Sequence, residues 1–409
     1  MNHLDLALKA AYPRALATLV RVLGSIDGAE DAVQEAAARA VKIWPERGVP
    51  DLPAAWLVRV GRNHAVDGFR RKAVESRHAQ SLALEVESFE TSPDEDRAGA
   101  PMDDDLLRLI FTCCHPILKP DDQVALTLKT LAGLSVEEIG RAYLMPAATL
   151  EKRLTRAKAR LREAQVPYEV PPIEQLPARL DAVLTVVYLV FNEGYKASLG
   201  PELMRLDLCR EAIRLGRMLA RAFREEPEVS GLLALMLLNH SRAPARVDDT
   251  GQAVTLDEQE RNLWDHALIV EGRTLVEKTL LRKQPGPYQV QAAIAALHNE
   301  AESIGQTDWR QIALLYAELE RFQPSPVVTL NRAVALARWQ GPAAGLALLK
   351  EIEGLPAMGG YHHFHAARAS LLLDVGQTAE ARRAFEKALS LAENERERDY
   401  LKKKIVGLD

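Results

Sequence analysis

The sequence predicts an all-α protein, and three observations lead to this prediction. Apolar residues make up 47% of the chain while aromatic residues make up only 5%, so alanine and leucine, which favour helices, supply most of the core. Apolar positions recur at three- and four-residue spacings along most of the chain. A single short stretch, in which Val247 and Val254 flank Asp249-Thr250-Gly251, indicates a small hairpin inside an otherwise helical protein.

The net charge and the cysteine content limit the class of protein. The formal net charge is −5, so any nucleic-acid-binding surface must be local. We find neither a secretion signal at the N-terminus nor an apolar run of about eighteen residues, which predicts a cytoplasmic protein with no membrane partner. Three cysteines, Cys113, Cys114 and Cys209, are too few for a disulfide framework and suit a reducing compartment.

Three helices are expected in the first 72 residues. The first covers residues 4–23, and the second, Ala29–Trp44, has a buried side and an acidic patch near its start. The third covers Ala54–Lys72 and carries five Arg or Lys and one Asp from Arg59 onwards, which makes a local basic patch. The buried side of the second helix is expected to hold Ala29, Val33, Ala36, Ala37, Ala40, Val41 and Trp44, and its acidic patch Glu30, Asp31, Gln34 and Glu35.

The stretch from Leu134 to Glu163 predicts two short helices with a tight turn between them. Ser135 and Glu138 form a capping box at the first helix, and Met145-Pro146 interrupts the pattern before the second. The second helix has an apolar stripe and a separate basic face, as in a helix-turn-helix whose second helix enters the major groove. A basic helix that is merely solvated is the alternative. The stripe is Leu150, Leu154, Ala157 and Leu161, and the basic face is Lys152, Arg156 and Arg160, flanked by Arg153, Lys158 and Arg162.

The start of this second helix holds the candidates for DNA contact. Its early residues are near enough to the helix N-terminus to reach base edges or phosphates. Arg160 and Arg162 lie farther along and are expected to contact the DNA backbone, where contacts position the protein without reading the sequence. The early residues are Thr149, Glu151, Lys152, Arg153 and Arg156.

These motifs resemble those of the extracytoplasmic-function (ECF) sigma factors. The segments AEDAVQE and AWLVRVGRNHAVDGFRR resemble region 2 of that family, and the helix-turn-helix with the preceding KPDDQVALTLKTLAGLS (Lys119–Ser135) resembles region 4. The resemblance divides the first part of the chain into region 2 (1–72), an acidic linker (73–104) and region 4 (105–166). The linker is either a solvated spacer or, as in the family, a segment that threads the polymerase cleft.

The resemblance implies a subunit that binds RNA polymerase core and directs it to promoter DNA, with no enzymatic activity and no cofactor. The acidic residues Asp31, Gln34 and Glu35 are then expected to dock on the polymerase. A helix-turn-helix regulator with a repeat-type sensor, acting without the polymerase core, is the alternative. The minus-10 element is assigned to Arg59, Arg62, Asn63, Arg70 and Arg71, and the minus-35 element to Thr149, Glu151, Lys152, Arg153, Arg156 and Arg160.

The rest of the chain is expected to form a helical extension. The proline-rich joint VPYEVPP is followed by a helical middle domain (170–305), which contains the hairpin and the apolar helix Leu176–Asn192. In residues 306–409, Gly341 and Gly376 are 35 residues apart and each separates two helices, a tetratricopeptide-like period. The whole chain resembles the ECF subgroup called ECF42, whose tetratricopeptide-like solenoid implies a possible protein partner on the repeats.

Three groups of polar residues are interpreted as structural. Adjacent cysteines seldom bind one metal ion, so Cys113-Cys114-His115 is expected to be a buried helix end. The histidines His362, His363 and His365 have no partnering acid or cysteine, so packing or surface roles are expected and no metal is predicted. The segment NEGY (192–195) has no nucleophile, base and orienting group beside it. It is expected to tie a helix end to a neighbouring helix, with an enzyme in residues 170–300 as the alternative.

Overall fold

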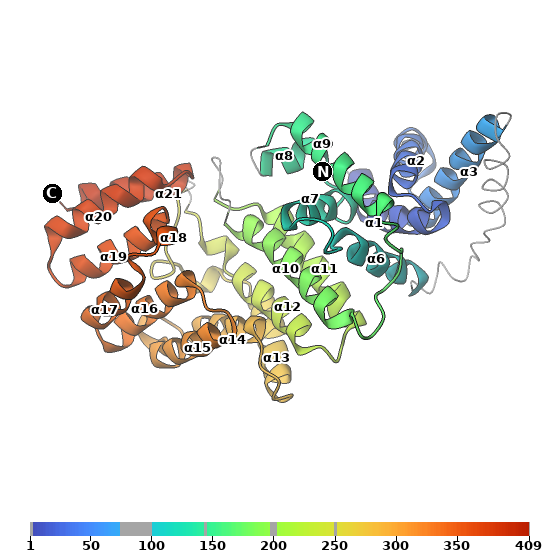
Figure 1. Ribbon diagram of the computed structural model, residues 1–409. Coiled ribbons are helices and arrows are strands. Elements are labelled where there is room, and N and C mark those ends of the chain that lie inside the picture. Colours follow the sequence, from blue (N-terminus) through green and yellow to red (C-terminus); the bar gives the residue numbers. More distant parts are fainter. Residues whose placement is uncertain (1–2, 74–99, 143–144, 197–202, 249–251, 409) are drawn as a thin grey trace. The chain divides into compact units, whose positions relative to one another are not determined.

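The computed structural model describes residues 3–73, 100–142, 145–196, 203–248 and 252–408 (Figure 1). Within these ranges every named element is a helix, which confirms the all-α prediction. The expected hairpin is reduced to one antiparallel bridge between Val247 and Ala253, because a two-stranded pairing by itself has little stability. The turn of that hairpin, 249–251, lies outside the described residues, as does most of the predicted acidic linker.

The chain divides into two compact units, residues 1–186 and 187–409, and the division falls inside helix α10. The first is unit 1 and the second is unit 2. No helix among the described residues is both long and apolar enough to cross a membrane. Unit 1 contains α1 (His3–Leu23), α2 (Ile26–Arg47), α3 (Pro53–Ala73), α6 (Ala100–Cys113), α7 (Pro120–Thr130), α8 (Val136–Ala142), α9 (Ala147–Glu163) and the first part of α10 (Leu176–Tyr195).

Helices α1, α2 and α3 pack against one another. Helix α2 begins before Ala29, at Ile26, because the Ser25 side chain caps it by accepting a hydrogen bond from Gly28 N at 3.2 Å. Its buried side follows the predicted stripe, except that Ala37 is half-buried and Val41 is 55% exposed. The prediction that Val41 is buried was therefore wrong, because the buried row continues from Ala40 to Trp44 at a four-residue spacing, and a residue directly after Ala40 points about 100° away from that row. Glu30, which the sequence places in the acidic patch, is buried instead.

The helices of the predicted region 4 start and pack as their local sequence specifies. The Ser135 hydroxyl accepts from Glu138 N at 3.1 Å, and the Glu138 carboxylate accepts from Ser135 N at 2.7 Å, which confirms the capping box. All four residues of the predicted stripe of α9 are buried. Cys113 and Cys114 are fully buried at the end of α6, where their thiols contact the hydroxyls of Thr130 and Thr127, as expected for a structural helix end.

Four side chains join α1, α6 and the residues that follow α9. Asp105 of α6 is buried and accepts hydrogen bonds from Arg21 at 2.7 Å and from Thr18 at 3.0 Å. The Tyr168 hydroxyl lies 2.8 Å from the carbonyl of Ala17 and 2.9 Å from that of Asp105. Because this tyrosine belongs to the proline-rich joint VPYEVPP, the joint is fixed on the helices of unit 1.

Unit 2 is built from the second part of α10 and the helices that follow it. Helix α12 (Pro227–His240) is apolar on all sides and is buried among α11 (Leu206–Ala222), α13 (His266–Leu280) and α14 (Pro287–Glu300). Helix α15 (Trp309–Phe322) is followed by α16 (Pro326–Gln340), α17 (Pro342–Ile352), α18 (Pro356–Gly359), α19 (His362–Asp374), α20 (Thr378–Leu391) and α21 (Glu395–Val406). From α15 onward, each helix packs on the next one along the chain, except that α17 packs on α19 across the four-residue α18 (Figure 1).

Two glycines separate the helix pairs of this last part. Gly341, between α16 and α17, has a φ of 98°, and Gly376, between α19 and α20, has a φ of 80°. Side chains with a Cβ rarely adopt this region, so glycine is the residue that lets the chain reverse here. The prediction that each glycine ends one helix before another is confirmed.

Candidate nucleic-acid and polymerase interface

The first half of α9 presents an exposed polar surface. Thr149, Glu151, Lys152 and Arg156 are exposed, while the apolar stripe on the other side holds the helix in unit 1. The Arg156 guanidinium donates to the Lys152 carbonyl at 3.2 Å, which keeps its side chain along the helix surface. This part of α9 has the features of a helix that can enter a major groove, with donors near its N-terminus.

Two of the six residues predicted to contact the minus-35 element are paired within the protein. Arg153 lies 3.1 Å from the Asp122 carboxylate and 3.5 Å from that of Asp121, both in the first turn of α7. Arg160 lies 3.8 Å from Asp122. The sequence shows these arginines only as members of a basic helix, because their acidic partners are about 30 to 40 residues earlier in the chain.

The far side of α9 faces α2. Lys158 Nζ lies 2.6 Å from an Asp27 carboxylate oxygen and 2.9 Å from Glu30, and Arg162 lies 3.5 Å from Asp27. Burial by itself would lower the pKa of Lys158, but the hydrogen bond to Asp27 and the charge of Glu30 raise it. Lys158 therefore stays charged and links the two predicted DNA-binding parts. A cavity of about 260 Å³ lies beside this contact, lined by Lys158, Arg162 and Tyr168 among others.

The predicted polymerase-docking patch lies on the exposed face of α2. Asp31 and Gln34 are exposed, and Glu35 accepts a hydrogen bond from Arg39 at 2.9 Å. That hydrogen bond lowers the pKa of Glu35. The exposed Val41 adds an apolar side chain two helical turns farther along α2, so the patch combines acidic, polar and apolar groups.

The basic patch of α3 is described only in part. Arg59 and Asn63 are exposed one helical turn apart, and Arg62 is partly buried. The side chains of Arg70 and Arg71 lie outside the described residues, although α3 continues to Ala73. Helix α3 runs without interruption through Gly61, where a Cβ would lie 2.9 Å from the Ala32 carbonyl. The glycine thus allows α3 to approach α2 closely.

The segment NEGY at the end of α10 makes a junction between helices in unit 2. A Cβ on Gly194 would lie 2.7 Å from Cys209 N, and the Gly194 carbonyl accepts from Arg205 N at 2.7 Å. The Tyr195 hydroxyl accepts from Arg242 at 2.9 Å, and the Arg246 guanidinium lies 3.8 Å from the Tyr195 ring centroid. The expected structural role of this segment, tying a helix end to its neighbour, is confirmed.

One expectation about the histidines of α19 is wrong. His362 and His363 do have a partnering acid, because Glu397 of α21 lies 2.9 Å from His362 Nε2 and 3.9 Å from His363 Nε2. His365 points elsewhere and contacts the Gly359 carbonyl at 3.1 Å. Glu397 is 35 residues from His362 in the sequence, so spacing along one helix gives no sign of this cluster.

Comparison with known proteins agrees with the geometry of unit 1. Residues 8–74 match the family model Sigma-70 region 2, residues 108–161 match Sigma-70 region 4, and residues 179–280 match a family of unknown function (DUF6596). No solved structure matches the chain.

Three relatives illustrate how far the similarity extends. An uncharacterized protein of Rhizobium meliloti (strain 1021) is 47% identical over 406 residues, which cover 99% of this chain and 96% of the relative. The ECF RNA polymerase sigma factor SigW of Bacillus subtilis (strain 168) is 30% identical over 150 residues, 35% of this chain and 78% of the relative. The ECF RNA polymerase sigma-E factor of Escherichia coli (strain K12) is 26% identical over 156 residues, which cover 37% of this chain and 81% of the relative. The sigma-factor similarity is thus confined to the first part of the chain.

Proposed function

Since this chain belongs to the extracytoplasmic-function sigma factors of RNA polymerase, we propose that it binds the polymerase core in the cytoplasm and selects promoters through α3 and α9. The observation that carries this proposal is the exposed first half of α9, with Lys152 and Arg156, on a capped helix-turn-helix. Such a helix suits the major groove of a minus-35 element. Exposed Arg59 and Asn63, with Arg62, Arg70 and Arg71, are proposed for the minus-10 element.

The proposed docking surface for polymerase is the patch of α2 formed by Asp31, Gln34 and Glu35. Its acidic groups suit a basic surface on the core enzyme. The exposed Val41 on the same helix supports the assignment, because protein interfaces combine apolar contacts with a polar rim.

The contact between α2 and α9 has a consequence for this function. Minus-10 and minus-35 elements are about 25 base pairs apart, or about 85 Å along the DNA. The ion pairs from Lys158 and Arg162 to Asp27 join α9 to α2, and Gly61 of α3 lies against Ala32 of α2. With a helical rise of about 1.5 Å per residue, these contacts keep the Cα atoms of Arg156 and Arg59 within roughly 40 Å of each other. We infer that this arrangement opens before both elements are bound.

The C-terminal extension is proposed to support the sigma-factor part and to offer its repeats to a protein partner. Arg179, in the first part of α10, donates to the Phe111 carbonyl of α6 at 2.6 Å, and Tyr168 bonds to α1 and α6. The residues after region 4 thus contribute contacts to unit 1. The two helix pairs divided at Gly341 and Gly376 favour assignment to the ECF42 subgroup with tetratricopeptide-like repeats.

In-vitro transcription with core polymerase tests the function. The template is the DNA upstream of the protein's own gene, and the proteins are the full chain and the fragments 1–164, 1–168 and 1–195. We expect promoter-directed transcripts from the full chain, and activity that falls from 1–195 to 1–164 as the α10 and Tyr168 contacts are removed. Full activity of 1–164 would contradict the role of the extension, and higher activity than the full chain would indicate inhibition.

The same proteins separate the sigma factor from an ordinary regulator. A regulator that acts without polymerase retards promoter DNA specifically when it is added alone. A sigma factor requires core enzyme for specific binding. Specific retardation by the purified chain, with no transcripts from core polymerase, would overturn the proposed function.

A further inference from the structure

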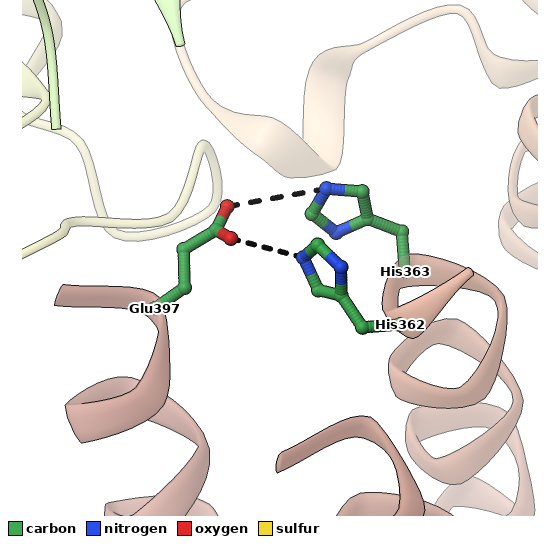
Figure 2. Close-up of side chains that lie close together, drawn as sticks. All are labelled: His362, His363 and Glu397. Carbon is green, nitrogen blue, oxygen red and sulfur yellow. Dashed lines mark hydrogen bonds and ion pairs between the residues drawn. The ribbon is translucent and has the colours of Figure 1, made fainter. Parts of the chain in front are cut away.

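We propose that His362, His363 and Glu397 form a binding site for a divalent transition-metal ion of the zinc class in unit 2. The histidines belong to the first turn of α19 and the glutamate to the first turn of α21. Figure 2 shows both imidazole rings and the carboxylate pointing towards one another from these two helices. Their donor atoms all lie within 4.8 Å of one another.

The distances within the cluster are close to those between ligands of one metal ion. Zinc binds imidazole nitrogen and carboxylate oxygen at about 2.0–2.2 Å, so two ligands of a tetrahedral site are about 3.3 Å apart. The Glu397 carboxylate lies 2.9 Å from His362 Nε2 and 3.9 Å from His363 Nε2. One distance is shorter and the other longer than this separation, so binding of one ion requires a small rotation of these side chains.

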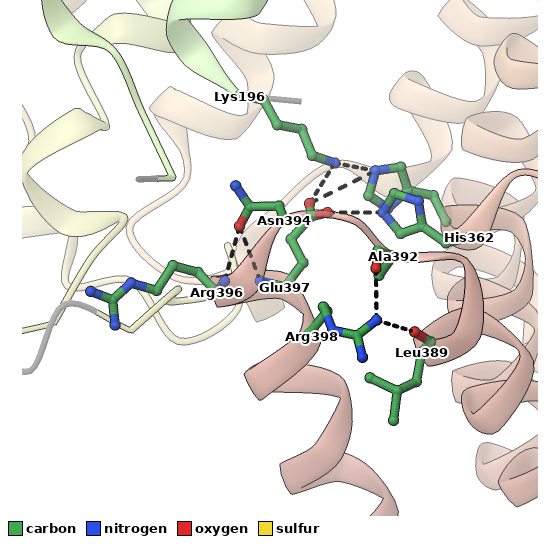
Figure 3. A network of polar contacts seen from close by, with 9 residues as sticks. Lys196, His362, Leu389, Ala392, Asn394, Arg396, Glu397 and Arg398 are labelled. Atoms are coloured by element: carbon green, nitrogen blue, oxygen red, sulfur yellow. Dashed lines mark hydrogen bonds and ion pairs between the residues drawn. The ribbon is translucent and has the colours of Figure 1, made fainter. Parts of the chain in front are cut away.

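The backbone that carries the glutamate is fixed by neighbouring polar contacts. Asn394 caps α21 by accepting hydrogen bonds from Arg396 N at 3.0 Å and from Glu397 N at 3.3 Å. Arg398 donates to the carbonyls of Leu389 and Ala392, at 3.0 and 2.9 Å (Figure 3). Such supporting contacts orient metal ligands and preserve affinity.

A cationic group already lies among the proposed ligands. Lys196 Nζ is 3.1 Å from Glu397 (Figure 3). It also contacts His363 Nε2. A carboxylate oxygen and an imidazole nitrogen thus bind an ammonium with the same donor atoms that a metal ion uses. The Lys196 side chain is 40% exposed, so it can leave to solvent, and the metal ion would then replace it as the cation.

The donor set indicates the class of metal. Two imidazoles and one carboxylate are typical ligands of Zn²⁺ and of neighbouring transition metals, whereas Ca²⁺ and Mg²⁺ prefer oxygen alone. Three protein ligands leave a fourth position for water or a small ligand, and these residues line a cavity of about 210 Å³. The partial positive charge at the starts of α19 and α21 opposes a cation, but it is a small effect beside three ligand bonds.

Titration of the full-length protein with Zn²⁺ by calorimetry tests the site, and Co²⁺ absorption reports its geometry. We expect one ion per chain and tetrahedral Co²⁺ bands. Replacing a residue that only hydrogen-bonds to a metal ligand typically weakens a metal site by about 10- to 100-fold. Loss of a ligand itself, in His363→Ala or Glu397→Gln, should therefore weaken binding by about 100-fold or more. The matched control is His365→Ala, on the same helix but outside the cluster, which should bind as the wild type does.

Lys196→Met keeps all three ligands and removes the competing ammonium. We expect this variant to bind Zn²⁺ more tightly than the wild type. Circular dichroism of the metal-free proteins shows whether His363→Ala and Glu397→Gln fold. If either does not, Lys196→Met still tests the site. Absence of saturable binding, equal affinity in the ligand variants, or unchanged affinity in Lys196→Met would overturn the proposal and leave a structural polar cluster.

Discussion

The basic side chains of α9 differ in what they contact, although the sequence presents them as one group. Arg156 is exposed, whereas Arg153 is held by Asp121 and Asp122, and Lys158 by Asp27 and Glu30. A charge that is already paired must give up its partner before it binds phosphate. We therefore expect single substitutions along this helix to have unequal effects on promoter binding.

Arg156→Ala tests whether an exposed basic side chain of α9 contacts DNA. The substitution should weaken promoter binding by the polymerase holoenzyme by an amount on the order of 1–3 kcal/mol, typical of a lost base or phosphate contact. Filter binding over a range of salt concentrations measures it. Arg321→Ala, which removes an exposed arginine of α15, is the control. Identical transcription by wild type and Arg156→Ala at every salt concentration would show that α9 does not face DNA.

The acidic patch of α2 is tested by Asp31→Lys with Glu35→Lys. Both side chains are on the outside of α2, so reversal should weaken co-purification with core polymerase while the thermal unfolding of unit 1 changes little. Loss of the Glu35–Arg39 pair affects only the helix surface. Asp51→Lys, an exposed acid between α2 and α3, is the control. Undiminished association with core enzyme would refute the docking assignment.

At the scale of helices, close approach of backbones decides where small residues are required. Gly61 of α3 lies against α2 and α1, where a Cβ would meet the Ala32 carbonyl at 2.9 Å and Leu19 Cδ1 at 3.0 Å. Gly68 lies two turns farther along α3, where a Cβ would meet nothing within 4 Å. The same residue type in one helix is thus required at one position and dispensable at the other.

This difference gives a matched pair of substitutions. Gly61→Ala should destabilise the protein by about 1–3 kcal/mol, because the backbone of Ala32 cannot move aside without strain. Gly68→Ala should stabilise it by about 0.5–1 kcal/mol, because alanine restricts the unfolded chain and favours helix. Chemical denaturation of both variants measures the difference. Equal effects would mean that α2 and α3 do not pack as described.

At the scale of unit 1, the Lys158 contact sets how the predicted DNA-binding parts separate. The pKa of Lys158 is raised in the folded state, so its contribution to stability is complete below its ordinary pKa of about 10.4 and is lost as pH rises beyond that value. Near neutral pH the contact therefore does not respond to pH. Salt weakens the outer part of the contact, because the Asp27 and Arg162 side chains are partly exposed, and it affects the buried pair of Lys158 and Glu30 less.

Asp27→Asn removes the carboxylate that Lys158 and Arg162 share, leaves Lys158 its pair with Glu30, and does not change the surface of α9. We expect a larger separation of α2 and α9, and severalfold tighter promoter binding with core enzyme at low salt, because less energy is needed to open the contact. Dyes on Lys42→Cys and Glu163→Cys report the separation, since the native cysteines are buried.

Asp51→Asn is the control for this experiment. The difference between Asp27→Asn and wild type should shrink at high salt, where the wild-type contact is screened. An unchanged dye separation at low salt would show that the contact does not hold α2 and α9 together.

Much of the fold was predictable because it depends on residues a few positions apart. The capping box of Ser135 and Glu138, the buried stripe of α9 and the turns at Gly341 and Gly376 involve neighbours along one helix or loop. Side chains three or four residues apart lie on one face of a helix, so their spacing is enough to specify such features. The same local patterns were sufficient to show the resemblance to regions 2 and 4.

The sequence by itself therefore determined the helical class, the helix-turn-helix and the candidate surfaces of α2, α3 and α9. Only the tertiary structure decided which charged groups meet. Lys158 and Glu30 are 128 residues apart, and His362 and Glu397 are 35 apart. Periodicity places a side chain on a face of its own helix but does not identify the helix that packs against that face, because the packing depends on the whole core.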